Sequence, residues 1–455
     1  MIAFTLSDTA KLLNGQVVGT DARFTSVSTD SRTLSKGDLF VALQGPNFDG
    51  HEHLSQARNK GATAAMVSRQ VEGSLPQLQV ADTRLGLGEL AAHWRQASSA
   101  EVVAVTGSNG KTTVKEMIAA ILSLQGRTLA TLGNLNNDIG LPLTLLRLQD
   151  EDYAVVELGA NHPGEIKYLS DIARPNIALL NNAGRAHLEG FGSLEGVARA
   201  KAEIISGLAE DGVFVFNADD QWAELWRELA AERATCTFGM RAEADVSSPE
   251  AVIETHWNES GFISRFPVKT PAGEIEIDLP LAGRHNRMNA LAAIAATQLM
   301  GVSLQQIREG LMNLQPVQGR LQPLAGAGGV CIIDDSYNAN PDSVEAAVAV
   351  LSTAPGRRFL VLGDLAELGS KSEQLHELLG QQACQAGIEN LYCLGELSGA
   401  TARGFGVGAE LFQNHDALIG ALKKQLTKGD TVLIKGSRSA CMELVVNALL
   451  EGGKD

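Results

Sequence analysis

Residues 104–114, "AVTGSNGKTTV", combine a glycine-rich turn with a lysine and two threonines. The strand-like run "EVVAV" precedes this turn, and an amphipathic helical pattern follows it. Backbone amides in such a loop can surround phosphate oxygens, and the dipole of the following helix adds positive potential at the same point. Lys111 is then expected to contact the β- and γ-phosphates of a nucleotide, and the Thr112 hydroxyl to bind Mg²⁺. The predicted nucleotide-binding loop consists of Gly107, Ser108, Asn109, Gly110, Lys111, Thr112 and Thr113.

One position of this loop departs from the general phosphate-loop pattern G-x-x-x-x-G-K-[ST]. Val105 stands where that pattern has its first glycine. The alternative interpretation is a capped helix start with a solvated lysine. The strand before the turn and the helix after it favour a nucleotide site.

Further candidate ligands follow the next apolar strands. "YAVVELGANHPGEI" puts Glu157 at the end of an apolar strand, where packing does not explain a carboxylate. "IALLNNAGRAHLEG" carries His187 in a polar loop, and "VARAKAEI" carries Lys201 on an expected helix. Taken alone, His187 can equally be a local hydrogen-bonding residue and Lys201 a solvated side chain.

The elements that must position these residues belong to an α/β protein of several domains. A chain of 455 residues is too long for one core, since single cores stop growing near roughly 250–300 residues. Aromatic residues make up only 5% of the chain and 47 residues are glycine, which suits α/β architecture better than an all-β sandwich. We expect a small α/β domain over residues 1–82, a central parallel-sheet ATPase domain over 83–313, and a Rossmann-like doubly wound domain over 314–455.

The pattern of apolar runs supports this division. "DLFVAL", "AAMVS" and "LQVA" predict short strands in the first domain, with one helix after "FDGHEHL". "ADTRLGLGELAAHWRQ" predicts a connecting helix capped by Asp82 or Thr83. "VVAV", "YAVVEL", "IALLN" and "VFVFN" predict buried parallel strands, "GEIEIDLPLAG" a hairpin or an antiparallel edge strand, and the residues from about 286 a helix. "VCIIDD", "FLVLGD", "LYCLG" and "TVLIKG" predict a second parallel sheet, without the G-x-G-x-x-G of a dinucleotide site.

Composition excludes several classes of protein. A net charge of −16 argues against nucleic acid as a partner, because its backbone needs a basic surface. The five cysteines form no C-x-x-C pair, which favours buried, reduced thiols. Neither a signal peptide nor a run of about 18 apolar residues is present, so we expect a cytoplasmic protein without a membrane span.

Taken together, the loop sequences resemble the Mur ligases of peptidoglycan synthesis from end to end. "TGSNGKTT" and "GRHN" are typical of the whole family. "GNLNNDIG", "ELGANHPGEI" and "DDSYNANPDS" are most similar to the members that join D-alanyl-D-alanine to UDP-N-acetylmuramoyl-tripeptide. The loop pattern of the family is G-x-x-G-K-[ST], in which a valine at position 105 is regular.

The resemblance implies ATP and two Mg²⁺ ions as cofactors. Its first metal site corresponds to Thr112 and Glu157, and its second to Glu157, His187 and Lys201. In this family the lysine is carbamylated, which turns a cation into a carboxylate-like ligand. Lys111, Glu157, His187 and Lys201 are therefore the expected catalytic set. The remaining ATP contacts implied by the family are Asn286, Asn289, Arg320 and Asp335.

The same resemblance implies the substrate contacts. The first domain is expected to bind the UDP end of the substrate, through Ser28, Thr29, Asp30, Ser31, Arg32, Asn47, Asp49 and His51. Hydroxyl and acidic side chains suit uracil and ribose, and an arginine suits the diphosphate. Further substrate contacts are expected at Asn136, Asn137, Tyr337, Asn338, Lys435, Ser437 and Arg438, with the third domain closing over ATP and binding the dipeptide.

The implied chemistry is activation of a carboxylate by ATP, followed by attack of the dipeptide amine on an acyl phosphate. Alternatives are another ligase of the superfamily that adds a single amino acid, such as folylpolyglutamate synthetase, or a phosphate-loop protein that only binds nucleotide. A monomer with small-molecule substrates is expected. The general base, the dipeptide pocket, and the choice between diaminopimelate and lysine as third peptide residue stay open.

Overall fold

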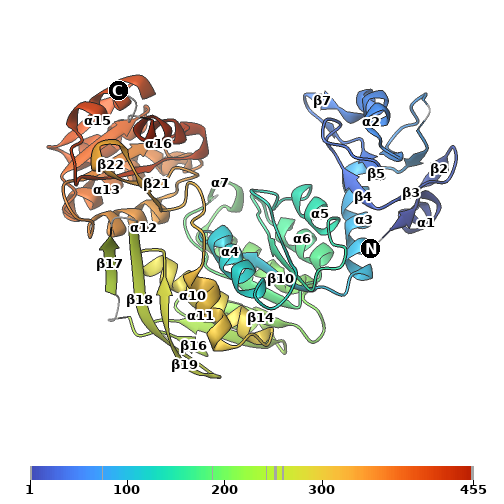
Figure 1. The fold of residues 1–455 in the computed structure, drawn as a ribbon, viewed down its shortest axis with the longest axis horizontal. Helices are drawn as coiled ribbons and strands as arrows, with labels where there is room; N and C mark the ends of the chain where they lie inside the picture. Colours follow the sequence, from blue (N-terminus) through green and yellow to red (C-terminus); the bar gives the residue numbers. More distant parts are fainter. Residues whose placement is uncertain are drawn as a thin grey trace.

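The computed structural model describes residues 3–73, 75–186, 188–241, 243–250, 254–258 and 261–451. Three main sheets of five, ten and six strands lie within residues 16–79, 101–279 and 322–435. We refer to residues 3–82, 83–313 and 314–451 as the N-terminal, central and C-terminal parts. The N-terminal and C-terminal parts flank the central part on opposite sides (Figure 1). The mixed α/β fold predicted from the sequence is confirmed.

The N-terminal part is built on a mixed sheet with the strand order β2-β9-β8-β5-β4. Its three predicted strands are present as β5, β8 and β9, and its predicted helix is α2, whereas the short helix α1 was not predicted from the sequence. The elements are β1 (Phe4–Thr5), α1 (Leu6–Leu12), β2 (Gln16–Val18), β3 (Arg23–Phe24), β4 (Ser26–Ser28), β5 (Asp38–Val41), β6 (Gln44–Gly45), β7 (Phe48–Asp49), a 3₁₀ turn (Gly50–His53), α2 (Leu54–Lys60), β8 (Ala64–Val67) and β9 (Gln77–Gln79).

Helix α3 (Thr83–Ala97) connects the N-terminal and central parts. Asp82 is its N-cap and accepts hydrogen bonds from the backbone N–H groups of Arg84 and Leu85. Of the two caps predicted, the aspartate is therefore the one used. Trp94 on α3 stacks on Phe4 with ring centroids 5.3 Å apart and donates from Nε1 to the carbonyl of Leu148 at 2.7 Å. One buried side chain thus contacts both parts.

The central part carries a largely parallel sheet in the order β11-β12-β10-β13-β14-β15-β16-β18-β17, with β19 paired to β18. Strands β10, β12, β13 and β14 contain the predicted buried runs and pair in parallel. Strand β19 is the predicted antiparallel strand, and it forms an antiparallel excursion with β18, which was not predicted. The strands are β10 (Glu101–Thr106), β11 (Thr128–Ala130), β12 (Tyr153–Glu157), β13 (Ile177–Leu180), β14 (Val213–Asn217), β15 (Ala234–Gly239), β16 (Val246–Ser247), β17 (Glu254–Asn258), β18 (Gly261–Thr270) and β19 (Gly273–Leu279).

Helices cover this sheet, and α4 and α10 pack with strands of its centre in one apolar cluster. Helix α10 begins two residues before the predicted start. The helices are α4 (Lys111–Leu122), α5 (Gly140–Leu145), α6 (Glu165–Ala173), α7 (Leu188–Phe191), α8 (Leu194–Ala202), a 3₁₀ segment (Glu203–Gly207), α9 (Ala223–Ala230), α10 (Arg284–Leu299) and α11 (Leu304–Met312).

The C-terminal part is a second sheet in the order β20-β21-β25-β22-β23-β24, parallel except for β20. The four predicted strands are β21, β22, β23 and β25. Its elements are β20 (Gln322–Ala325), β21 (Cys331–Asp335), α12 (Pro341–Leu351), β22 (Arg358–Gly363), α13 (Ser372–Gln385), β23 (Asn390–Leu394), α14 (Ser398–Phe405), β24 (Ala409–Phe412), α15 (His415–Gln425), β25 (Thr431–Lys435) and α16 (Glu443–Leu450), with 3₁₀ turns at Ala327–Gly329, Gly369–Lys371 and Arg438–Ala440.

The central part also packs against the C-terminal part. Phe262 on β18 belongs to the same apolar cluster as the buried residues of the C-terminal sheet, so the antiparallel excursion of the central part packs against the C-terminal part. Among the helices within the described ranges, none is long and apolar enough to cross a membrane.

Candidate active site

The phosphate loop lies at the carboxyl ends of the central strands because of the sheet register. Val105, the second-last residue of β10, pairs with Glu157 at the end of β12. Thr106, the last residue of β10, pairs with Leu180 at the end of β13. Parallel strands present their carboxyl ends at one edge of the sheet, where ligands of such folds bind. The loop, the carboxylate and the polar loop after β13 therefore meet.

Glycines give the loop its shape. Gly107 and Gly110 have φ values of 151° and 79°, in the region that favours glycine. A Cβ atom on Gly110 would lie 2.4 Å from Oδ1 of Asn289 and 2.6 Å from Nδ2 of Asn181. Helix α4 begins directly after this glycine, so the loop passes as close as the backbone allows over two buried amides.

Asparagines after β13 hold the loop in place. The backbone N–H of Asn109 donates to the Asn182 side chain at 2.8 Å, and its carbonyl accepts from the side chains of Asn181 and Asn182 at 3.0 Å. The Ser108 hydroxyl accepts from the N–H of Gly184 at 2.9 Å. Neither Asn181 nor Asn182 was predicted to be a functional residue, although two asparagines directly after an apolar strand are a visible signal in the sequence.

Lys111 folds back over the loop. Its Nζ donates to the carbonyl oxygens of Gly107 at 2.7 Å and Ser108 at 3.3 Å. Burial lowers the pKa of this lysine, and the positive charge of Arg320 acts in the same direction, against the attraction of Glu157. A partly buried ammonium held by the loop carbonyls is suited to bind an anion.

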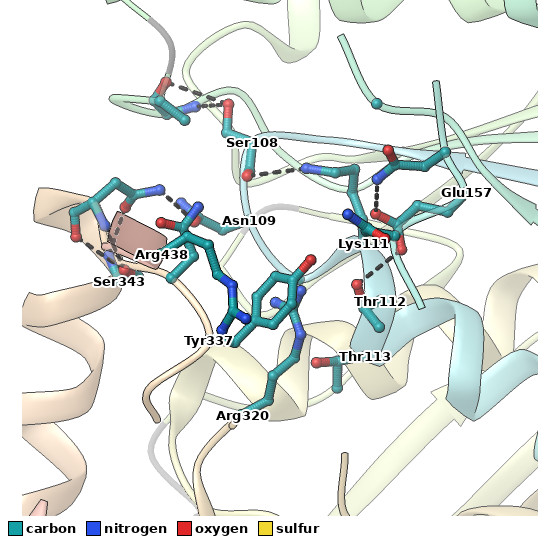
Figure 2. Close-up of a pocket in the computed structure, with 18 of the residues that line it drawn as sticks. Ser108, Asn109, Lys111, Thr112, Thr113, Glu157, Arg320, Tyr337, Ser343 and Arg438 are labelled. Atoms are coloured by element: carbon teal, nitrogen blue, oxygen red, sulfur yellow. Dashed lines mark hydrogen bonds between the residues drawn. The ribbon is translucent and has the colours of Figure 1, made fainter. Parts of the chain in front are cut away.

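Glu157 is the carboxylate at the centre of the site. It is 3% exposed, and its two oxygens accept hydrogen bonds from the Thr112 hydroxyl at 2.8 Å and from Asn136 Nδ2 at 2.7 Å. Its backbone N–H donates to Thr131 Oγ1 at 3.0 Å. Figure 2 shows Thr112 and Glu157 pointing toward each other beside Lys111. The carboxylate of Glu157, the hydroxyl of Thr112 and the side-chain oxygen of Asn136 belong to one cluster, and Mg²⁺ prefers hard oxygen ligands of these kinds.

The other residues predicted for the second metal site are only partly described. His187 lies outside the described residues. Lys201, on α8, is 1% exposed, and its Nζ lies 3.5 Å from the carbonyl oxygen of Ala160 and 5.3 Å from the centre of the Phe191 ring. Burial lowers the pKa of Lys201 to about 7, helped by the charge of Lys111. The alternative prediction, that Lys201 is a solvated side chain on the surface of the helix, is therefore wrong.

These groups open into one cavity of about 1350 Å³ that extends between the central and C-terminal parts. Most of the predicted ATP, metal and dipeptide-side residues line it: Ser108, Asn109, Gly110, Lys111, Thr112, Thr113, Asn136, Asn137, Glu157, Asn286, Asn289, Arg320, Asp335, Tyr337, Asn338, Lys435, Ser437 and Arg438. Gly107 and Lys201 do not line it. Figure 2 shows Ser343 on one side of the view, Lys111 and Thr112 on the other, and Arg320, Tyr337 and Arg438 between them.

The two asparagines predicted to contact adenine lie on the first turns of α10. Asn289 is 4% exposed and accepts from Asn181 Nδ2 at 2.8 Å while donating to Asn286 Oδ1 at 3.1 Å. Asn286 in turn donates to the carbonyl of Ala282 at 2.9 Å. Both side chains therefore already belong to the network beneath the phosphate loop.

The residues predicted on the C-terminal part are also partly engaged. Lys435 is 2% exposed and donates to Asp335 at 2.6 Å and to the carbonyl of Asn338 at 2.9 Å. The guanidinium of Arg320 stacks on the Tyr337 ring at 4.3 Å. Lys435 and Asp335 neutralise each other, and Arg438 pairs with Glu443 at 3.1 Å, so Arg320, stacked on Tyr337, contributes positive charge to this wall.

The central and C-terminal parts touch at the loop itself. Asn340, the N-cap of α12, donates from Nδ2 to Asn109 Oδ1 at 2.7 Å. Arg185 donates to Asp342 and, at 2.6 Å, to Glu345 Oε1. Neither contact was predicted, because each joins side chains more than 150 positions apart.

The eight N-terminal residues predicted to bind the UDP end lie away from this cavity. Arg32 pairs with Asp30 at 2.8 Å, which lowers the pKa of that carboxyl to about 2. His51 is 3% exposed, and both ring nitrogens have partners, Asp49 at 2.6 Å and the backbone N–H of Ser68 at 3.0 Å. The others are Ser28, Thr29 and Ser31 on or beside the Asp30 turn, and Asn47, which is exposed on the β6–β7 hairpin.

Models of known protein families match nearly the whole chain. Residues 23–95 match the Mur ligase family, catalytic domain; residues 105–297 the Mur ligase middle domain; and residues 319–438 the Mur ligase, glutamate ligase domain.

Individual relatives match over their full length. UDP-N-acetylmuramoyl-tripeptide–D-alanyl-D-alanine ligase of Escherichia coli K12 is 50% identical, with all of both chains covered. The structure of UDP-N-acetylmuramoylalanyl-D-glutamyl-2,6-diaminopimelate–D-alanyl-D-alanyl ligase from Acinetobacter baumannii has a TM-score of 0.88 at 37% identity, with 99% of each chain covered. That of MurF ligase from Thermotoga maritima in complex with ADP has a TM-score of 0.84 at 29% identity, covering 94% of this chain and 97% of that one. The chain belongs to the Mur ligase family.

Proposed function

We propose that this protein is an ATP-dependent ligase that joins D-alanyl-D-alanine to UDP-N-acetylmuramoyl-tripeptide in peptidoglycan precursor synthesis. The observation that carries this proposal is the cavity in which a phosphate loop and the Thr112–Glu157 pair face arginines of the C-terminal part. The 50% identity to the E. coli enzyme of that name supports the choice of substrates.

The reaction needs a phosphate grip and charge neutralisation more than a protein nucleophile. The tripeptide carboxylate attacks the γ-phosphorus of ATP, the bond to ADP breaks, and an acyl phosphate forms. The dipeptide amine then attacks the acyl carbon, loses a proton, and inorganic phosphate leaves. Positioning and electrostatic stabilisation dominate such phosphoryl transfers. Lys111 and the loop amides supply these at the transferred phosphoryl group.

The donor set beside the loop fits Mg²⁺. Thr112 and Glu157 would hold the ion, Asn136 orients the carboxylate, and Thr131 fixes the backbone of Glu157. When bound, Mg²⁺ neutralises charge on the phosphates and the developing transition state. A second ion at Glu157, His187 and Lys201, with Lys201 carbamylated, is part of the proposal. The burial of Lys201 supports it, since burying an ammonium is costly and a carbamate is a metal ligand.

The division of labour among the domains is also proposed. Domains at 1–82, 83–313 and 314–455 would bind the UDP end, ATP and the dipeptide, respectively. The proposal for the first domain is supported by the exposed Arg32 and Asn47. Asn286, Asn289, Arg320 and Asp335 would contact ATP, and Tyr337, Asn338, Ser437 and Arg438 the substrates, because all of them line the cavity. We further propose a monomer that works in the cytoplasm, where ATP and nucleotide-linked precursors are made.

One assay tests the reaction. Phosphate release from ATP is expected to require UDP-N-acetylmuramoyl-tripeptide and D-alanyl-D-alanine together, with Mg²⁺ present. Replacing the dipeptide by D-alanine, D-glutamate or L-lysine is expected to abolish it. Turnover with a single amino acid, or nucleotide binding without any turnover, would reject the assignment.

A further inference from the structure

An ion pair marks the end of the cavity nearest the N-terminal part. Arg84, on the first turn of α3, donates from NH2 to Asp138 Oδ1 at 2.8 Å, and its Nε bonds the other oxygen of the same carboxylate. Asp138 belongs to the loop between β11 and α5. Both side chains line the cavity, and they are 56% and 32% exposed. A cation and an anion are thus presented side by side to the same space.

Arg84 holds a particular place among the cations of this cavity. Within the described part of its wall, Arg84 is the one lysine or arginine that precedes the phosphate loop in sequence. The others come from the loop or later, and they are Lys111, Arg185, Arg320, Lys435 and Arg438. These lie with the loop and the C-terminal part, where the nucleotide and the dipeptide are proposed to bind. Arg84 lies at the start of α3, the helix that leads from the N-terminal part, where the UDP end is proposed to bind, into the central part.

Asp138 is also close in sequence to Asn136, which contacts the proposed metal ligand Glu157. Asn136, which contacts Glu157 at 2.7 Å, precedes Asp138 by two residues, so their Cα atoms are at most about 7 Å apart. The reacting carboxylate of the tripeptide is on its third residue. The side chain of that residue would then extend from the phosphate loop along this wall toward the pair. Leu85, next to Arg84, is 55% exposed in the same wall and offers an apolar contact for methylene groups.

We propose that Arg84 and Asp138 form the subsite for the side-chain end of the third peptide residue, and that they select an end carrying both a carboxylate and an ammonium group. Arg84 binds the carboxylate through its planar fork, and Asp138 binds the ammonium. The residue selected is of the 2,6-diaminopimelate type rather than lysine, whose side chain ends in an ammonium group alone. This inference rests on the proposed ligase function and adds its peptide specificity.

Little free energy is needed to separate Arg84 from Asp138 so that each can pair with the substrate instead. An exposed ion pair contributes only about 0–1 kcal/mol, so separating Arg84 from Asp138 costs little. A zwitterionic end restores both pairings, and Arg–carboxylate bonds are bidentate and charge-assisted. A lysine end satisfies Asp138 but leaves Arg84 without its anion, which is the physical basis of discrimination.

The test compares two substrates in the same assay. Phosphate release is measured with D-alanyl-D-alanine and with UDP-tripeptides that end in 2,6-diaminopimelate or in L-lysine. The wild type is expected to show a KM roughly tenfold or more lower for the diaminopimelate substrate, as for loss of one charged hydrogen-bonding partner. Arg84→Met is expected to raise that KM by a similar factor, to leave kcat nearly unchanged, and to leave the lysine substrate unaffected. Asp138→Asn is expected to raise KM for both substrates.

Arg127→Met is the matched control, because Arg127 forms an exposed pair with Asp150 that does not line the cavity. Arg84→Lys provides a second variant that keeps the charge and removes the fork. Equal KM values of the wild type for the two tripeptides would overturn the subsite while leaving the ligase function intact. If Arg84→Met raised KM equally for both substrates, the pair would have a structural role only and would not select the third peptide residue. Failure of the wild type to use the dipeptide at all would instead reject the ligase function.

Discussion

The carboxylate of Asp342 accepts two hydrogen bonds from Arg185, from its backbone N–H at 2.7 Å and from Nε at 2.5 Å. Arg185 lies in the loop after β13 that supports the phosphate loop, and Asp342 lies on the first turn of α12 in the C-terminal part. Asp342 also packs closely against Gly184, the residue before Arg185. A Cβ atom at position 184 would lie 2.4 Å from Asp342 Oδ2, so a larger residue does not fit there. The contact therefore couples the nucleotide loop to the position of the C-terminal part.

This contact is expected to contribute to nucleotide affinity although neither side chain needs to touch the nucleotide. Arg185→Met and Asp342→Asn should each weaken ADP binding, and the double variant should weaken it little further, with a coupling free energy of about 1 kcal/mol. Calorimetric titration of the four proteins measures this cycle. Arg403→Met, which breaks an exposed pair with Glu373 within the C-terminal part, is the control. Strictly additive losses would show that the two residues act separately.

Lys111 is expected to matter more for the chemical step than for folding. Its ammonium is held by the loop carbonyls of Gly107 and Ser108, next to the proposed position of the transferred phosphoryl group. Lys111→Met should lower kcat by about 10²-fold or more, as for removal of one preorganised electrostatic group. Thermal unfolding should change little, because burial of the charge is costly and a methionine of similar length fits. A kcat within a few-fold of wild type would remove Lys111 from the phosphate grip.

Lys201 is expected to depend on carbon dioxide. If it is carbamylated, Lys201→Ala should lose most of its activity and regain part of it with added short carboxylic acids. The wild type should lose activity in CO₂-depleted buffer and recover with bicarbonate, and ¹³C-bicarbonate should give a carbamate signal in NMR. Lys167→Ala, an exposed lysine paired with Asp171, is the control and should show none of these effects. Full activity of Lys201→Ala would exclude a metal-ligand role.

His285 is expected to limit stability in acid. Burial lowers the pKa of this imidazole from 6.5 to about 4, with a further contribution from Lys435. Between these values the unfolded chain binds a proton that the folded protein does not, so stability is lost as the pH falls from 6.5 toward 4. The slope is at most about 1.4 kcal/mol per pH unit for one proton.

The corresponding measurement is the midpoint of thermal unfolding from pH 7.5 to 4.5. Wild-type protein should lose stability faster over this range than His285→Asn, whose side chain does not titrate. His53→Gln changes an exposed histidine and should follow the wild type. Parallel curves for wild type and His285→Asn would contradict a buried neutral imidazole.

The sequence predicted local features well, and the reason is that they depend on neighbouring residues. The strand–loop–helix around Lys111, the strand end at Glu157 and the helix cap at Asp82 each follow from short patterns of apolar and capping residues. The short helix α1 was missed, because seven residues with a single Thr5 cap give a weak periodic signal.

Contacts between distant residues could not be predicted in this way. The pairs Asn109–Asn340 and Arg185–Asp342 depend on how the C-terminal part sits on the central part, which no local pattern encodes. Lys435 was expected to meet an anionic ligand, but it is also the partner of Asp335 because β21 and β25 are neighbours in register. The family resemblance supplied the roles of Lys201 and the adenine-side asparagines, which spacing alone left open.

The close approach of Gly110 to Asn181 and Asn289 has a consequence for the evolution of this site. A side chain at position 110 would displace two amides that come from β13 and α10, and through them the support of the whole loop. The three positions therefore cannot drift independently. Among homologues, a residue other than glycine at 110 should occur only together with smaller residues at 181 and 289, and a library that varies the loop alone should contain few folded members.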